Sequence, residues 1–310
     1  MIAPPLASQT IFHKARALRP GDPVAVIAPA GPFDRESFEA GLAIVAARYS
    51  AQYDSEIFQR QRYLAGSDSR RLAELNRALT DPAIRAVFCA RGGYGTMRLL
   101  QRLDAEGAAK PVVGFSDITA LHQWQQSHGF VSIHGPVLTQ LGRLGRATSE
   151  RLFSLLESHS PAAPLSGTTT FVNGTAEGPL LGGNLSVFTR LLGTPFMPNL
   201  EGAVLMLEDV GERPYRLDRM WTHLELAGVF RKISGIVLGS FTHCEERNEA
   251  YSSQDVLREL AVATGLPCSA GFPIGHGDVN EPVALGVRVR LDANANRLTF
   301  LEAAASEQSS

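Results

Sequence analysis

Ser116 is the first residue whose surroundings suggest covalent chemistry. It follows the apolar run 111–115 and precedes the amphipathic stretch 118–127, which predicts a serine at a strand-to-helix junction. At such a junction the hydroxyl is exposed at the carboxyl edge of the sheet, and the amide of Asp117 points at the group that the serine attacks. Ile118 stands where the pattern G-x-S-x-G has its second glycine. Helix capping by Ser116 or Asp117 is the alternative interpretation.

A serine nucleophile needs a base, and two of the eight histidines follow apolar runs directly before a glycine. His134 lies in SIHGP. His276 lies in GHG, where a glycine on each side lets the backbone turn tightly, so we favour it over His134. An ordinary turn histidine is the alternative. Four other histidines fit the surfaces of amphipathic helices: His122, His128, His159 and His223.

Glu208 is the candidate carboxylate that would orient this base. It ends the apolar run 203–207, where a charge is costly unless it is paired or lies at a sheet edge. Asp209 is its rival and would point the opposite way from a strand. A strand-end acid that pairs with an arginine is the alternative. The chain order Ser116, Glu208, His276 is the nucleophile–acid–base order of α/β-hydrolases.

The loop RGGYG at residues 91–95 follows the apolar run 84–89. Such a loop could cradle a phosphate at a helix N-terminus, but it lacks both the P-loop ending and the G-x-G-x-x-G spacing. In an acyl-transfer reaction, the amide of Gly93 would be the second donor to the oxyanion. Losing one such donor costs about 3–4 kcal/mol of transition-state stabilisation. A tight turn is the alternative.

The elements that must position these residues alternate along the first half of the chain. Continuous apolar runs predict buried strands at 24–30, 84–89 and 111–115. Amphipathic stretches predict helices at 34–49, 67–79, 96–103 and 118–127, with Asp34 capping the first. This alternation indicates an α/β fold whose N-terminal parallel sheet is flanked by helices.

Residues 159–178 are rich in proline, serine and threonine, which is typical of a linker. We therefore predict a nucleophile-bearing α/β domain at 14–165 and a smaller C-terminal α/β domain at 178–304 that carries Glu208 and His276. Further strands are predicted at 203–207 and 236–241, and helices at 185–192, 213–229 and 252–264. Apolar and polar residues alternate at 283–291 and 297–301, which predicts a β-hairpin with one wet face.

Composition excludes several classes of protein. The chain has 310 residues, 44% hydrophobic and 19% charged, which is enough to build a core. Its net charge of −2 argues against a nucleic-acid binder or a polybasic membrane-surface protein. Three cysteines without CxxC spacing argue against a disulfide framework and against a structural zinc site. Residues 1–20 do not resemble a signal peptide and no apolar run spans a bilayer, so a cytoplasmic protein is expected.

Six strings in this order resemble the LD-carboxypeptidase family of serine peptidases: CARGGYG (89–95), GFSDIT (114–119), HGP (134–136), LLGGNL (180–185), LEDVGERPYRLDRMW (207–221) and GFPIGHG (271–277). The resemblance extends from about residue 20 to residue 301. It implies an N-terminal parallel α/β domain, a smaller C-terminal domain with β-structure, and an active site between the two.

The resemblance also implies roles for individual residues. The family nucleophile falls on Ser116, the triad glutamate on Glu208 and the triad histidine on His276. The amides of Gly93 and Asp117 fall in the oxyanion hole. Two further positions are candidates for substrate binding, namely Asn184 in GGN and Arg91 in the glycine loop.

The implied activity is that of a serine-type carboxypeptidase without metal or cofactor. It would hydrolyse the bond between the L-centre of a diamino acid and the terminal D-alanine of murein tetrapeptides, in cytoplasmic cell-wall recycling, as a homodimer. The alternatives are the same chemistry on a microcin-C-like peptidyl-nucleotide or other acyl-amide, a non-catalytic binding protein on this scaffold, and a phosphate- or sugar-binding protein that uses residues 91–95.

Overall fold

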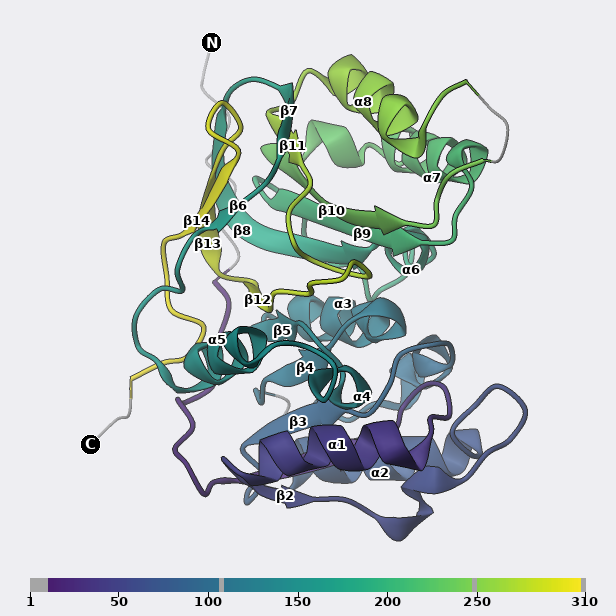
Figure 1. Cartoon of the computed structure of the whole chain (residues 1–310), viewed down its shortest axis with the longest axis vertical. Helices are drawn as coiled ribbons and strands as arrows, with labels where there is room; N and C mark the ends of the chain where they lie inside the picture. The colour runs from purple at the N-terminus through teal and green to yellow at the C-terminus, as the bar shows by residue number, and fades with distance from the viewer. Residues whose placement is uncertain (1–10, 106–108, 247–249, 308–310) are drawn as a thin grey trace.

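A computed structural model describes residues 11–105, 109–246 and 250–307. Half of the stretch considered for a signal peptide, residues 1–10, lies outside these ranges. The structure contains two sheets, one in the lower and one in the upper half of Figure 1. It is a mixed α/β fold with a parallel sheet flanked by helices, as the sequence predicts.

The first sheet has the strand order β12-β5-β4-β3-β1-β2. Five of its strands are parallel: β1 (Pro23–Ile27), β2 (Ser50–Gln52), β3 (Ala86–Cys89), β4 (Val112–Gly114) and β5 (Ser132–His134). The sixth, β12 (Val283–Leu285), comes from near the end of the chain and pairs antiparallel with β5. The carboxyl ends of the parallel strands therefore meet at one edge.

Helices bury both faces of this sheet, which explains the continuous apolar runs. The helices are α1 (Arg35–Ala46), α2 (Asp68–Thr80), α3 (Thr119–Ser127), α4 (Leu138–Leu141) and α5 (Arg146–Glu157). Val24 and Val26 of β1 share a core with Phe38 of α1. Ile27, on the opposite face, shares a second core with Leu75 of α2. Successive residues of a strand point to opposite faces, so the side chains of one strand pack in two cores.

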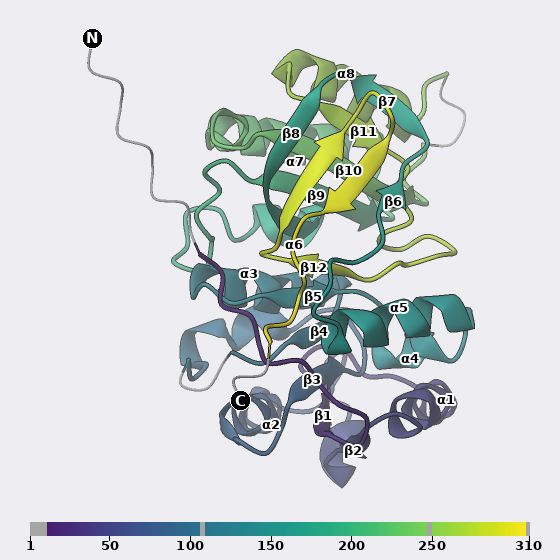
Figure 2. The same ribbon diagram turned by 90° about the vertical axis from the view of Figure 1, so that its left-hand side faces the viewer.

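The second sheet has the order β6-β14-β13-β8-β9-β10-β11-β7. Its strands are β6 (Leu165–Ser166), β7 (Thr169–Val172), β8 (Thr175–Asn184), β9 (Val204–Val210), β10 (Gly235–Thr242), β11 (Cys268–Ala270), β13 (Arg288–Asp292) and β14 (Arg297–Phe300). The accompanying helices are α6 (Leu185–Thr189), α7 (Pro214–Leu226) and α8 (Ser253–Thr264). Figures 1 and 2 both place α8 at the end of the molecule away from α1 and α2.

Two predicted helix starts are confirmed by their hydrogen bonds. Asp34 caps α1 by accepting a bond of 2.7 Å from the amide of Ser37. Ser252 and Asp255 form a reciprocal capping box at the start of α8. The helix predicted at 96–103 is instead two 3₁₀ turns, Thr96–Arg98 and Leu100–Arg102. The amide of Thr96 is bound by a side chain from another loop, which is described below.

The structure differs from the sequence prediction in two other segments. The stretch predicted as a linker contains β6 and β7, because Leu165 and Phe171 are buried in the core. The predicted strand 283–291 is broken at Gly286, which has φ +92°, so β12 joins the first sheet and only β13 forms the hairpin with β14. A β-carbon at Gly286 would lie 2.9 Å from the ring of Phe12.

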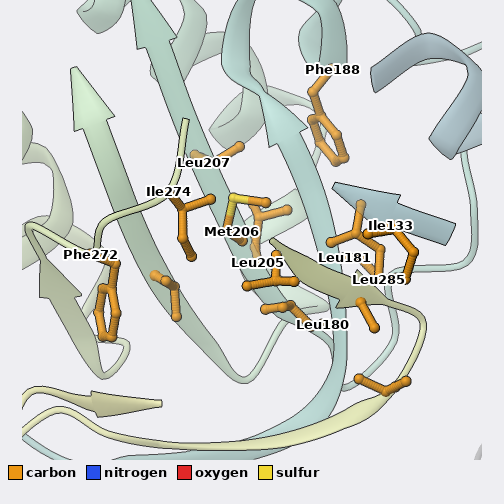
Figure 3. Packing of buried hydrophobic residues seen from close by; sticks show 14 of the residues in the cluster. Ile133, Leu180, Leu181, Phe188, Leu205, Met206, Leu207, Phe272, Ile274 and Leu285 are labelled. Atoms are coloured by element: carbon orange, nitrogen blue, oxygen red, sulfur yellow. The ribbon is translucent and has the colours of Figure 1, made fainter. Parts of the chain in front are cut away.

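The two sheets meet through shared packing. In Figure 3, Ile133 of β5 and Leu285 of β12 lie beside Leu180 and Leu181 of β8. Gln123 of α3 also donates a bond of 2.9 Å to the carbonyl of Gly182 in β8. This contact brings the ends of β4 and β9, which carry the candidate residues, toward the same region.

Candidate active site

Ser116 lies where β4 gives way to a 3₁₀ turn (Ser116–Ile118) and then to α3. Its φ of +64° is in the left-handed region, which is unfavourable for a residue with a side chain. Phe115 before it is extended. Such strain is typical of a nucleophile elbow, where a sharp turn holds the hydroxyl out from the sheet.

The loop after β3 lies against this turn. A β-carbon at Gly92 would lie 3.1 Å from Oγ of Ser116, so a larger residue there would crowd the hydroxyl. Gly93 has φ +108°, and Gly31 in the loop after β1 donates its amide to the carbonyl of Gly92 over 3.0 Å. The loops after three neighbouring parallel strands therefore come together beside Ser116.

Glu208 and His276 are in direct contact. Nδ1 of His276 lies 2.6 Å from Oε2 of Glu208, although 68 residues separate them. Glu208 is fully buried on β9, and the side chain of His276 is 17% exposed. A buried carboxylate on Nδ1 fixes the ring orientation and leaves Nε2 as the nitrogen available to a nucleophile.

Asp209 points away from this histidine. Its carboxylate accepts three bonds, from Nδ2 of Asn184 at 3.0 Å and from the amides of Ser186 and Val210 at 2.8 Å each. Burial raises the pKa of Asp209 to about 6, the bond from Val210 opposes this shift, and the nearby charge of Glu208 adds to it. The rival carboxylate thus anchors the start of α6.

Asn184 is the residue that connects the two halves at this point. Its backbone amide donates to Oγ1 of Thr119 over 2.9 Å, and its side chain binds Asp209 and caps α6 through the amide of Val187. These bonds assign the side chain a positioning task. The predicted contact of Asn184 with substrate stays a prediction.

His276 also packs on the residue that precedes Ser116. The ring centroids of His276 and Phe115 are 4.6 Å apart. Within the described part of the chain, no hydrogen bond joins Ser116 to His276. The bond that the triad requires between them therefore stays a prediction. The packing nevertheless brings together a residue next to the β4 turn and a side chain from the loop after β11.

His122 and His134 lie behind Phe115 and are both fully buried. Nε2 of His122 is bound to the carbonyl of Gly114 over 2.8 Å, and burial lowers the pKa of His122 to about 4. Burial also lowers the pKa of His134 well below its usual value. The prediction that His122 lies on a helix surface is wrong, because this side of α3 faces the sheet.

Two side chains hold the glycine loop: sequence reasoning missed Arg71 altogether, and it missed this role of Asp117. The guanidinium of Arg71 is fully buried and donates to the carbonyls of Pro29 and, at 2.9 Å, Gly95. The carboxylate of Asp117 accepts the amide of Thr96 at 2.8 Å, and burial raises its pKa. A signal for Arg71 existed, since positions 71, 75 and 79 share one face of α2 and the latter two are leucines.

Arg91 lies at the start of the same loop, and its guanidinium donates to the carbonyl of Pro32. It lines a cavity of about 530 Å³ together with Gly93. Within the described ranges, no three His, Cys, Asp or Glu side chains are grouped as metal ligands would be. Nor does any helix in this part of the chain have the length and apolar character to cross a membrane.

Comparison with known proteins adds family relationships to this geometry. Residues 24–135 match the family model of the LD-carboxypeptidase N-terminal domain, and residues 177–291 match that of the C-terminal domain. The murein tetrapeptide carboxypeptidase of Pseudomonas aeruginosa is 37% identical over 297 residues, which cover 88% of this chain and 94% of that protein. A Bacillus subtilis relative that carries the name of a murein peptide carboxypeptidase is 36% identical over 311 residues, 96% of this chain and 97% of that protein.

Solved structures give the same result. The crystal structure of the muramoyltetrapeptide carboxypeptidase of Oxalobacter formigenes superposes with a TM-score of 0.81 at 28% identity and covers 93% of this chain and all of that one. The microcin C7 self-immunity protein MccF has the same fold, with a TM-score of 0.86 at 22% identity over 95% of this chain and all of that one.

Proposed function

Since the chain belongs to the LD-carboxypeptidase family of serine-type peptidases, we propose that it releases the terminal D-alanine of murein tetrapeptides. The bond cleaved joins the L-centre of the diamino acid to that D-alanine. The relatives named for this activity support the substrate. The observation that carries the chemistry is the contact of 2.6 Å between His276 and Glu208, from two distant segments.

Ser116 is the proposed nucleophile. His276 takes the hydroxyl proton through Nε2 as the oxygen attacks the scissile carbonyl, while Glu208 holds the ring and stabilises its charged form. The amides of Gly93 and Asp117 donate to the oxyanion. These five residues lie on loops and strands from both halves of the chain.

The two half-reactions share one proton carrier. When the tetrahedral intermediate collapses, His276 gives its proton to the leaving amine of D-alanine and an ester to Ser116 remains. Water then attacks the ester, and His276 again takes and returns the proton. No metal or cofactor has a role in these two half-reactions.

We also propose the division into domains at 14–165 and 178–304, since the two family models match separate ranges. Action in the cytoplasm agrees with three free, buried cysteines. A homodimer is proposed from the family resemblance, and light scattering of the purified protein tests it.

The decisive experiment compares the natural protein with Ser116→Ala on murein tetrapeptide. We expect the natural protein to release D-alanine, measured by mass spectrometry, and the variant to release none above background. Circular dichroism checks that the variant is folded. Near-normal turnover by Ser116→Ala would show that Ser116 is not the nucleophile.

A further inference from the structure

Two arginines line the cavity beside Gly93, which adjoins the proposed oxyanion hole. Arg60 and Arg91 both line it, together with Tyr63, Tyr94 and the backbone of Gly31 and Gly93. Gly93 connects the cavity to Ser116, because its neighbour Gly92 lies against that side chain. A group bound here would be close to the scissile bond.

Neither arginine has an ion-pair partner within the described ranges, although Asp34 is near Arg91: the bond from the Ser37 amide and, to a smaller extent, the charge of Arg91 lower the pKa of Asp34. The guanidinium groups of Arg60 and Arg91 instead donate to the carbonyls of Arg62 and Pro32. Four other arginines of this region are in ion pairs: Arg70 with Glu74, Arg71 and Arg98 with Asp68, and Arg77 with Asp54. The described lining of the cavity therefore has two cationic side chains and no acidic one, and its N–H groups are suited to a carboxylate.

Two tyrosines form the remaining wall. The rings of Tyr63 and Tyr94 meet edge to face with centroids 5.8 Å apart, and the side chains remain 55% and 43% exposed. Large aromatic groups that stay exposed beside a cavity offer an apolar surface and phenol donors to a ligand. A small amino acid with a methyl side chain and a free carboxylate matches this combination of an apolar wall and two arginines.

We propose that Arg60 and Arg91 bind the free carboxylate of the residue that is released. This inference rests on the proposed function, because an enzyme that removes one terminal residue must recognise a chain end. The carboxylate lies one residue beyond the scissile carbonyl, a span of about 3.8 Å between successive α-carbons. The cavity starts at Gly93, whose amide is itself a proposed donor to the oxyanion. The arginines thereby select the terminal bond.

The test uses murein tetrapeptide and the same peptide with a C-terminal carboxamide. We expect the natural protein to prefer the acid by about 100-fold in kcat/KM, since a charged pair of hydrogen bonds is lost with the amide. Arg60→Met and Arg91→Met should each lower kcat/KM for the acid about tenfold or more and leave that for the amide nearly unchanged. Arg62→Met, a neighbouring exposed arginine that does not line the cavity, is the matched control and should behave as the natural protein.

Three results would overturn the proposal. Equal losses on acid and amide would mean that the arginines only support the loop. Unchanged kinetics on the acid would place the carboxylate elsewhere. Loss of the variants' effect when lysine replaces a diamino acid that carries a side-chain carboxylate would assign the arginines to that carboxylate instead.

Binding to the inactive protein separates this inference from the proposed function. Calorimetry with Ser116→Ala should show tighter binding of the acid than of the amide, and Arg91→Met in that background should reduce the difference about tenfold or more. If the natural protein released no D-alanine while this preference persisted, the proposed reaction would fail and the carboxylate site would stand. If D-alanine were released normally but the acid bound no more tightly than the amide, the proposed reaction would stand and the carboxylate site would fail.

Discussion

Gly275 leaves room for the carboxylate of Glu208. A β-carbon at Gly275 would lie 2.7 Å from Cγ and 2.8 Å from Cβ of Glu208, and closer still to Oε2, the oxygen that His276 binds. The φ of Gly275 is +105°, which side chains rarely adopt. The residue before the proposed base is thus constrained by both its backbone and its neighbour.

Gly275→Ala should therefore separate His276 from Glu208. We expect a loss of kcat of at least about 100-fold, since the acid would no longer orient the base. Gly277→Ala is the control, because Gly277 is not in the positive-φ region and its nearest neighbour, Cβ of Ser240, is 3.3 Å from the added carbon. D-Alanine release gives the rates and thermal unfolding checks the fold. Equal activity of the two variants would contradict the assignment.

Glu208→Gln should mainly lower kcat, whereas Asp209→Asn should mainly lower Tm. Replacing Glu208 preserves shape but removes the charge that stabilises the imidazolium, so kcat should fall about 10³–10⁴-fold. Asp209→Asn places an amide group against N–H donors from Asn184, Ser186 and Val210, so its main effect should be a lower Tm. Measuring kcat and Tm for both variants tests this, and a greater kcat loss in Asp209→Asn would reverse the acid assignment.

Arg71→Met should disturb the glycine loop. Removing the buried guanidinium leaves the carbonyls of Pro29 and Gly95 without their donor and costs about 3 kcal/mol of stability. In the fraction that remains folded, kcat should fall more than KM rises, because the amide of Gly93 is misplaced for the transition state. Arg77→Met on the same helix removes only an exposed ion pair and is the control. A pure rise in KM would exclude a role in the oxyanion hole.

Stability should decrease in acid because of His122. Its folded-state pKa of about 4 lies below the ordinary value of 6.5, so the unfolded chain binds a proton first as the pH falls. The free energy of unfolding should drop between pH 6.5 and pH 4 by up to about 1.4 kcal/mol per pH unit from this group. His134 acts in the same direction, whereas the raised pKa of Asp209 acts oppositely below pH 6.

Comparing the natural protein with His122→Gln isolates this contribution. Urea unfolding from pH 7 to pH 4 should give a shallower pH dependence for the variant, by about one proton. Parallel curves would mean that the pKa of His122 is the same in the folded and unfolded protein.

The sequence by itself determined the features that depend on neighbouring residues. The continuous apolar runs around 24–30 and 84–89 identify strands buried on both faces, and Asp34 and Ser252 identify helix starts. The strand-to-helix junction at Ser116 was predictable for the same reason, since it lies between two patterned segments. The six strings identified the family.

Only the tertiary structure decided which distant groups meet. The choice of Glu208 over Asp209 depends on which face of β9 receives the loop of His276, and a run of buried residues does not reveal that face. The hydrogen bonds from Arg71 to the carbonyls of Pro29 and Gly95 depend on how α2 packs against two loops. Strand β12 adds to the first sheet because Gly286 turns the chain after Leu285. Local periodicity fixes elements, whereas the contacts between them follow from the packing of the two sheets as a whole.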